Sequence, residues 1–114
     1  MKIRDIINGE KPTLSFEVFP PKKDTDFANV EAAAFGIAGL SPSYMSVTYG
    51  AGGSTKGHTI ALAQAIQEKY NVPTIAHLTC VCANREGIKA ALSELKSAGI
   101  ENILALRGDI PKNY

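Results

Sequence analysis

The strongest constraint on the fold is an alternation of strand-like and helix-like segments along the whole chain. Apolar residues recur at every second position in some segments and at every third or fourth in others, which are the periods of a strand and of a helix. In order, the pattern predicts a short helix at 3–7, a strand at 13–19, a helix at 26–39, a strand at 44–49, a helix at 56–69, a strand at 74–79, a helix from Asn84 to Gly99 and a strand at 102–107. Strands that alternate with helices over short connections predict an α/β fold with a parallel sheet.

Local signals mark several helix ends. Asp24 or Thr25 is the expected N-cap of the helix at 26–39, because a short polar side chain there can accept a bond from a free backbone N–H group. Asn84 is the expected N-cap of the last helix, and Gly99 is expected to end it.

Two architectures fit this order of elements, an open doubly wound sheet and part of a (β/α)8 barrel. Central strands of a doubly wound sheet are covered on both faces and read as continuous apolar runs. The first two strands instead carry Ser15, Glu17, Ser46 and Thr48 on one face. A barrel interior that opens into a polar site explains this better. A closed barrel needs about 250 residues, so residues 1–114 are expected to form its first four strands and three helices.

Composition narrows the classes of function. Charged residues make up 20% of the chain and the net charge is +1, which disfavours a nucleic-acid binder. Apolar runs are too short to span a membrane, and the N-terminus lacks the apolar core of a secretory signal. With only Cys80 and Cys82, the expected location is the reducing cytoplasm.

Glu17 is the first candidate for chemistry. It lies late in a hydrophobic strand, on the face that would point into the barrel. A carboxyl group in a partly dry pocket can hold a proton near neutral pH and act as an acid. The alternative is a glutamate at a strand end that reaches solvent or pairs with a lysine such as Lys22.

Three further features are ambiguous from the residues alone. The glycine-rich segment at 50–54 matches neither the dinucleotide fingerprint nor the phosphate-loop motif, which favours a plain turn. His77 lies in the third strand with no partners at metal-ligand spacing, so no metal site is expected, and His58 is expected to be a solvated polar residue. Arg107-Gly108-Asp109 could hold a ligand beside a glycine that permits close approach, or form a surface ion pair.

Four motifs in order resemble the methylenetetrahydrofolate reductase family. They are Ser15-Phe16-Glu17-Val18-Phe19-Pro20-Pro21, Ser46-Val47-Thr48-Tyr49-Gly50-Ala51, Ala76-His77-Leu78-Thr79-Cys80 and Leu104-Ala105-Leu106-Arg107-Gly108-Asp109. Each stands at the end of a predicted strand, and together they are spread over most of the length of the chain, from Ser15 to Asp109.

The resemblance implies a reaction and its cofactors. NADH or NADPH would pass hydride to flavin adenine dinucleotide (FAD), and the reduced flavin would pass it to 5,10-methylenetetrahydrofolate, giving 5-methyltetrahydrofolate. It also implies roles for particular residues. Glu17 would bind the folate and protonate it to open its five-membered ring, and Asp109 would contact both flavin and folate. Thr48 would lie on the nicotinamide side, and the flavin would be lined by Tyr49, Ala51, His77, Arg107 and Gly108.

A second interpretation concerns the chain taken by itself. A half-barrel leaves the first and fourth strands with unpaired edges, which invite pairing with another chain. The alternative is therefore a catalytically incomplete half-barrel that folds or self-associates, and a homo-oligomer is expected.

Overall fold

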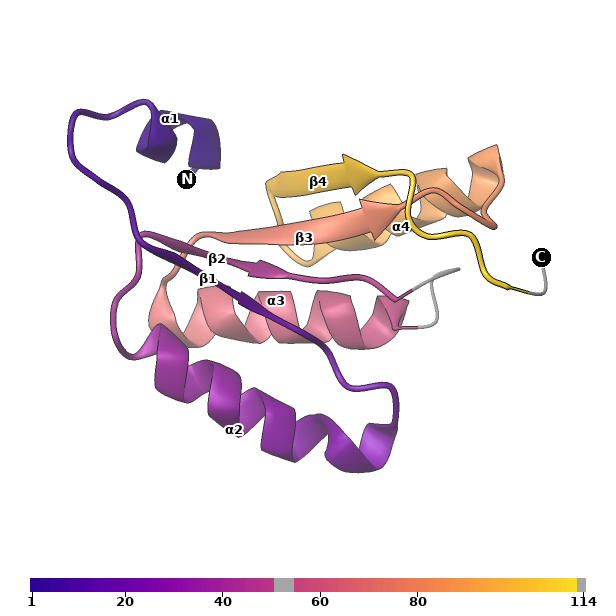
Figure 1. Ribbon diagram of the computed structural model, residues 1–114, viewed down its shortest axis with the longest axis horizontal. Helices are drawn as coiled ribbons and strands as arrows, with labels where there is room; N and C mark the ends of the chain where they lie inside the picture. The colour runs from indigo at the N-terminus through magenta and orange to yellow at the C-terminus, as the bar shows by residue number, and fades with distance from the viewer. Residues whose placement is uncertain (51–54, 113–114) are drawn as a thin grey trace.

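The computed structural model describes residues 1–50 and 55–112, in which four parallel strands alternate with helices (Figure 1). The strands are β1 (Ser15–Val18), β2 (Tyr44–Val47), β3 (Thr74–Thr79) and β4 (Asn102–Leu106), and the helices are α1 (Ile3–Ile7), α2 (Phe27–Ala38), α3 (Lys56–Tyr70) and α4 (Arg85–Ser97). Every predicted element is present in its predicted order, with ends that differ by one or two residues.

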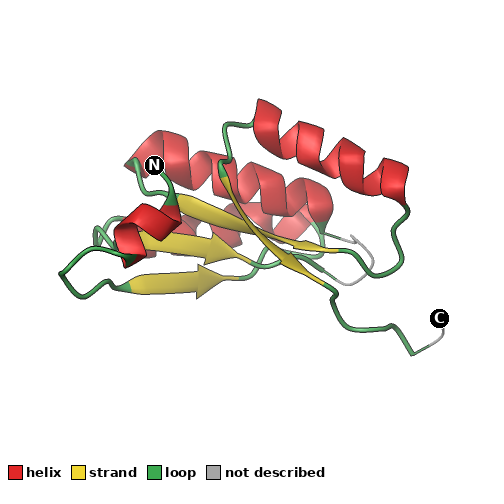
Figure 2. Cartoon of the chain, turned by 90° about the horizontal axis from the view of Figure 1, so that it is seen from above, coloured by secondary structure: helices red, strands yellow, loops and turns green. Residues whose placement is uncertain are grey.

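The sheet has the simplest possible order, β1-β2-β3-β4, so each strand pairs with the next one along the chain. Helices α2, α3 and α4 lie on one side of it, and the other face is left open (Figure 2). A doubly wound sheet reverses its strand order and carries helices on both faces. The arrangement is therefore an arc of a (β/α)8 barrel, as the polar strand faces predicted.

The core lies between the sheet and its helices. Alternate residues of the strands point into it, with Met45, Val47 and Ala76 completely buried. From the helices, Leu62 and Ile66 of α3 are also fully buried. This apolar layer fixes which strand face is covered, because a shift by one residue would turn every side chain to the other side.

Two predicted helix ends are confirmed and one is wrong. The Asn84 side chain accepts a hydrogen bond from the backbone N–H of Gly87 at 2.8 Å, and Gly99 follows α4 with φ +78°. Neither Asp24 nor Thr25 caps α2. A short 3-10 helix, η1 (Asp24–Asp26), runs directly into α2, and no side chain caps its start. The extended residue that precedes the helical turns is Lys23, whose side chain makes no capping bond, and Asp26 already has helical angles.

The predicted helix faces are correct in outline but not residue by residue. The helical spacing of apolar residues places Leu92 and Ile7 on the apolar faces of α4 and α1, yet Leu92 is 40% exposed and Ile7 is 52% exposed. Leu62 was not singled out, yet it is fully buried against the sheet. The width of the buried stripe on each helix depends on how that helix crosses the sheet, and the spacing of apolar residues does not specify this.

Candidate active site at the carboxyl ends of the strands

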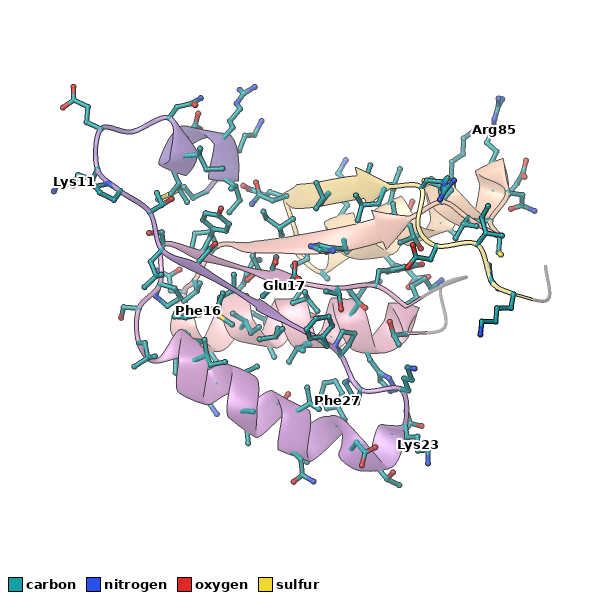
Figure 3. The ribbon with its side chains drawn as sticks, viewed as in Figure 1. Lys11, Phe16, Glu17, Lys23, Phe27 and Arg85 are labelled. Atoms are coloured by element: carbon teal, nitrogen blue, oxygen red, sulfur yellow. The ribbon has the colours of Figure 1, made fainter. Side chains whose placement is uncertain are left out.

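The chemistry-bearing residues of the four motifs gather on the open face and at the carboxyl ends of the strands. Glu17 pairs in register with Ser46 of the neighbouring strand, and His77 lies one strand further. Phe16, next to Glu17 in β1, packs instead against the core (Figure 3). The period of two along each strand therefore separates a packing face from a polar face.

Among the described residues, Glu17 has one hydrogen-bond partner and one close neighbour, and neither is a lysine. The Ser46 hydroxyl donates a hydrogen bond to Oε1 of Glu17 at 3.1 Å, and Nε2 of His77 lies 3.3 Å from the same oxygen. The Glu17 side chain is 49% exposed, whereas that of His77 is only 11% exposed. The carboxyl group is thus positioned by contacts from β2 and β3 and is accessible from the uncovered face of the sheet. It is not enclosed in the partly dry pocket that the sequence suggested.

A pocket of about 450 Å³ lies beside this cluster, at the ends of β2, β3 and β4. It is lined by Tyr49, Thr79, Leu106, Arg107, Gly108 and Asp109. Thr79 is two residues beyond His77 on the same strand face, so pocket and cluster adjoin. The Thr79 hydroxyl is buried and has no hydrogen-bond partner among the described residues. A buried hydroxyl without a partner is costly, which makes it a candidate for contact with a ligand.

Gly108 packs closely against the side chains that follow β3, in a backbone conformation that favours glycine. Its φ is +88°, and a Cβ atom there would meet Cβ of Thr79 at 2.8 Å and Cγ1 of Val81 at 2.9 Å. The absence of a Cβ thus permits a close approach to the protein's own side chains at the end of β3, and Gly108 also lines the pocket. This approach brings the segment that carries Arg107 and Asp109 against the end of β3.

Two buried threonines that the sequence analysis missed hold the end of β2. The Thr59 hydroxyl donates to the carbonyl oxygen of Thr48 at 2.8 Å, and the Thr55 hydroxyl accepts from the N–H of Gly50 at 2.7 Å. The two hydroxyls are 3.3 Å apart. The signal was available, since threonines four residues apart at a helix start lie on one face. These bonds fix the position of Tyr49 at the pocket. Ala51, expected to line the flavin, lies outside the described residues.

Tyr49 is the one described group whose pKa clearly departs from its ordinary value. Burial raises the pKa of Tyr49, and the nearby positive charge of Lys56 opposes this in part. The side chain therefore enters the pocket as a neutral hydroxyl over the physiological range, able to donate and to accept a hydrogen bond.

His58 is not the solvated residue that was expected. Its Nδ1 lies 2.8 Å from the carbonyl oxygen of Pro21, and its Nε2 lies 2.6 Å from a carboxylate oxygen of Asp24. The ring also packs beside that of Phe27. His58 thus ties the loop after β1 to the beginning of α3.

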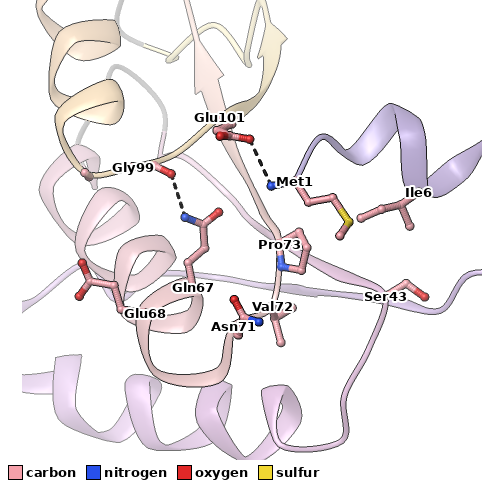
Figure 4. A pocket seen from close by; sticks show the side chains of 11 residues that line it. Met1, Ile6, Ser43, Gln67, Glu68, Asn71, Val72, Pro73, Gly99 and Glu101 are labelled. Carbon is pink, nitrogen blue, oxygen red and sulfur yellow. Dashed lines mark hydrogen bonds and ion pairs between the residues drawn. The ribbon is translucent and has the colours of Figure 1, made fainter.

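A larger pocket, of about 580 Å³, lies at the opposite ends of the strands (Figure 4). Its polar groups are largely paired with one another. The N-terminal ammonium group donates to Glu101 at 3.2 Å, and the amide of Gln67 donates to the carbonyl oxygen of Gly99 at 3.0 Å. Barrel enzymes carry their chemistry at the carboxyl ends of the strands, so the smaller pocket is the better candidate.

Two features are absent from the described ranges, 1–50 and 55–112. No three histidine, cysteine, aspartate or glutamate side chains there come together as a metal site would require. No helix in those ranges is long and apolar enough to cross a membrane.

Comparison with known proteins identifies the family. The family model described as methylenetetrahydrofolate reductase matches residues 2–114. A methylenetetrahydrofolate reductase (NADH) of Arabidopsis thaliana is 38% identical over 96% of this chain, methylenetetrahydrofolate reductase 2 of Schizosaccharomyces pombe is 40% identical over 99%, and the 5,10-methylenetetrahydrofolate reductase of Pectobacterium carotovorum is 33% identical over 87%. The chain spans 19%, 18% and 33% of the lengths of these relatives. The parallel arc with its polar open face and the match over nearly every residue lead to one conclusion: the chain belongs to the methylenetetrahydrofolate reductase family.

Proposed function

We propose that residues 1–114 are the N-terminal half of the (β/α)8 barrel of a flavin-dependent enzyme that reduces 5,10-methylenetetrahydrofolate to 5-methyltetrahydrofolate, with a nicotinamide cofactor as hydride donor. The observation that carries the proposal is the carboxyl group of Glu17, held at a strand end by Ser46 and His77 beside a pocket of ligand size. Family membership supports the reaction class, and the position of Glu17 on the open face supports its role as the acid.

Glu17 is the proposed acid. Reduction of the methylene carbon requires that one carbon–nitrogen bond of the folate's five-membered ring break first, and protonation of that nitrogen makes it a better leaving group. Glu17 stands on the open face, half exposed, where a substrate can reach it. The same carboxyl group would bind the folate before the proton moves.

The pocket beside Glu17 is the proposed place for part of the flavin, and its residues fit that group. Its volume of about 450 Å³ lies within the usual range for small-molecule sites. The Arg107 guanidinium can donate, the Asp109 carboxylate can accept, and the buried Thr79 hydroxyl lacks a partner among the described residues. When bound, FAD would supply the hydride-transfer chemistry, while these side chains hold and orient it.

The remaining assignments follow the resemblance of the four motifs, and the pocket supports some of them. Tyr49 and Gly108 line the pocket and would contact the flavin, as would His77 and Ala51. Asp109 would serve both flavin and folate, as a second catalytic residue. Thr48 would lie on the nicotinamide side. Because the plant relatives are named for NADH, NADH is the proposed donor.

The test separates the two half-reactions. Glu17→Gln keeps the size of the side chain and removes the acid, so reduction of methylenetetrahydrofolate should fall by about 10²-fold or more. Reduction of the bound flavin by the nicotinamide cofactor should be nearly unchanged, because no proton from Glu17 is needed there. Stopped-flow absorbance of the flavin follows both steps.

The matched control is Glu10→Gln, which changes an exposed glutamate ahead of β1 and should leave both half-reactions at their normal rates. If the folate step of Glu17→Gln remained as fast as that of Glu10→Gln, Glu17 would not be the acid. A purified chain that shows no visible flavin absorption and takes up no added FAD would contradict binding by these residues alone.

One observation favours a second candidate, a half-barrel that associates without catalysing. Strand β4 leaves Ile103, Leu104 and Leu106 between 37% and 43% exposed, an unusual exposure for sheet residues of a parallel fold. Pairing of open edges and faces between two copies would bury them. Mass measurement in solution at micromolar concentration tests this, and a clean monomer would exclude it.

A further inference from the structure

The two contacts to Glu17 converge on a single oxygen. Both the Ser46 hydroxyl, at 3.1 Å, and Nε2 of His77, at 3.3 Å, approach Oε1. Among the described residues, no hydrogen bond or ion pair reaches Oε2. The carboxyl group is therefore asymmetric, with one oxygen occupied by the protein and the other free.

The hydrogen-bonding chemistry of Ser46 and His77 indicates which oxygen of Glu17 carries the acidic proton. A serine hydroxyl that donates to Oε1 requires a lone pair there, and a protonated Nε2 would need a second one. With Oε1 acting as the acceptor, the acidic proton of a neutral carboxyl group belongs on Oε2. The contacts within the protein thus make Oε1 the acceptor and leave Oε2 to carry the proton.

The fold fixes these contacts. Glu17 and Ser46 are partners in the parallel register of β1 and β2, so their side chains leave the sheet on the same face and at the same height. His77 is only 11% exposed, which leaves its ring little room to turn away. Two adjacent strands and a mostly buried ring are better suited to hold a group within a few tenths of an ångström than a loop is.

We propose that Ser46 and His77 are positioning residues for Glu17: Ser46 donates a hydrogen bond to Oε1, His77 lies against the same oxygen, and Oε2 is left as the oxygen that donates the proton. The inference rests on the proposed function for its catalytic meaning. In the step, the Oε2–H bond breaks and an N–H bond forms on the ring nitrogen of the folate. The carbon–nitrogen bond breaks, and its electron pair remains on that nitrogen. The negative charge left on Glu17 spreads to Oε1, where the Ser46 hydroxyl donates to it and the edge of the His77 ring faces it.

The first experiment needs no activity. In the ¹³C- and ¹⁵N-labelled chain, NMR reports the Glu17 carboxyl carbon and shows which ring nitrogen of His77 carries a proton. Ser46→Ala should shift the Glu17 carboxyl signal. Ser15→Ala, a change of the same size on the same face of β1, should not. Nε2 of His77 should be protonated in the native chain at neutral pH, and Glu17→Ala should change its signal.

The second experiment uses the flavin-loaded protein. Ser46→Ala should slow reduction of methylenetetrahydrofolate by about 10- to 100-fold, the size expected for loss of a hydrogen bond to a charged group. The loss should appear in the maximal rate rather than in the affinity for folate, and flavin reduction by the nicotinamide cofactor should be unaffected. Ser46→Thr, which keeps the hydroxyl, should recover most of the rate.

Two results would overturn the positioning. One is a Glu17 carboxyl signal that Ser46→Ala moves no more than Ser15→Ala does. The other is an Nε2 of His77 that carries no proton while Glu17 is ionised. A protein that shows the expected NMR signals but never reduces the folate would instead overturn the proposed function, so the two failures are distinguishable.

Discussion

Replacing Gly108 by alanine places a methyl group where the structure has no room for one. The added Cβ would lie 2.8 Å from Cβ of Thr79 and 2.9 Å from Cγ1 of Val81, both attached to β3 or the segment that follows it. The backbone at Gly108 also has φ +88°, which a residue with a Cβ adopts only at a cost. Two penalties therefore act at one position.

The backbone cost and the steric cost of Gly108→Ala can be estimated and measured separately. The left-handed backbone costs about 1–2 kcal/mol for an ordinary residue, and overpacking costs about 1–3 kcal/mol. Gly108→Ala should thus lower the free energy of unfolding by about 2–5 kcal/mol. Gly99 is the matched control, because its φ is +78° but nothing lies within 4 Å of the added Cβ. Gly99→Ala should cost only the backbone part, about 1–2 kcal/mol.

Urea unfolding followed by far-ultraviolet circular dichroism gives both values, since a loss of stability lowers the midpoint without changing the slope. The same pair can be tested for FAD uptake, which Gly108→Ala should weaken and Gly99→Ala should leave intact. Equal losses of stability in the two variants would refute the reasoning. They would mean that Thr79 and Val81 can move aside to accommodate the added methyl group, so that their close approach to Gly108 does not contribute to stability.

Two further predictions concern the end of β2. Thr59→Val keeps the shape of a fully buried side chain but removes the hydroxyl that donates to the carbonyl oxygen of Thr48. It should lower the free energy of unfolding by about 1–3 kcal/mol, measurable as a lower thermal midpoint; no change would show that this bond does not hold the strand end. Because burial raises the pKa of Tyr49 above its ordinary value of 10.0, the unfolded chain ionises first as the pH rises. The contribution to stability is complete below about pH 10 and is lost as the pH rises through the folded-state pKa. Tyr49→Phe should therefore lose less stability than the native chain between pH 9 and pH 11 in urea titrations, and parallel losses would contradict the burial argument.

Local pattern was sufficient for the order and type of the elements. Periods of two and of three to four are written in the residues themselves, so all four strands and their helices were predictable to within one or two residues. The choice of a barrel arc over a doubly wound sheet was predictable too, because Glu17 and Ser46 mark one face of their strands as polar. Asn84 and Gly99 could be read as helix ends because a cap depends on the residues next to it.

Other features depend on segments that are distant in sequence, and only the tertiary structure decided them. Thr25 and Asp24 looked like caps, but both lie inside the 3-10 helix between β1 and α2, and the extended residue before it is Lys23. His58 looked solvated, but the loop after β1 returns to it. Gly108 was expected beside a ligand from its place at a strand end, but its close packing against the end of β3 could be seen only in the tertiary structure.

Glu17 shows the division most clearly. Its place on the polar face of a strand follows from the period of two, which the sequence alone determined. That one of its oxygens is held by Ser46 and His77 while the other stays free was decided by the register of three strands. Register is set by packing of the helices on the far face, and the residues around Glu17 do not encode it.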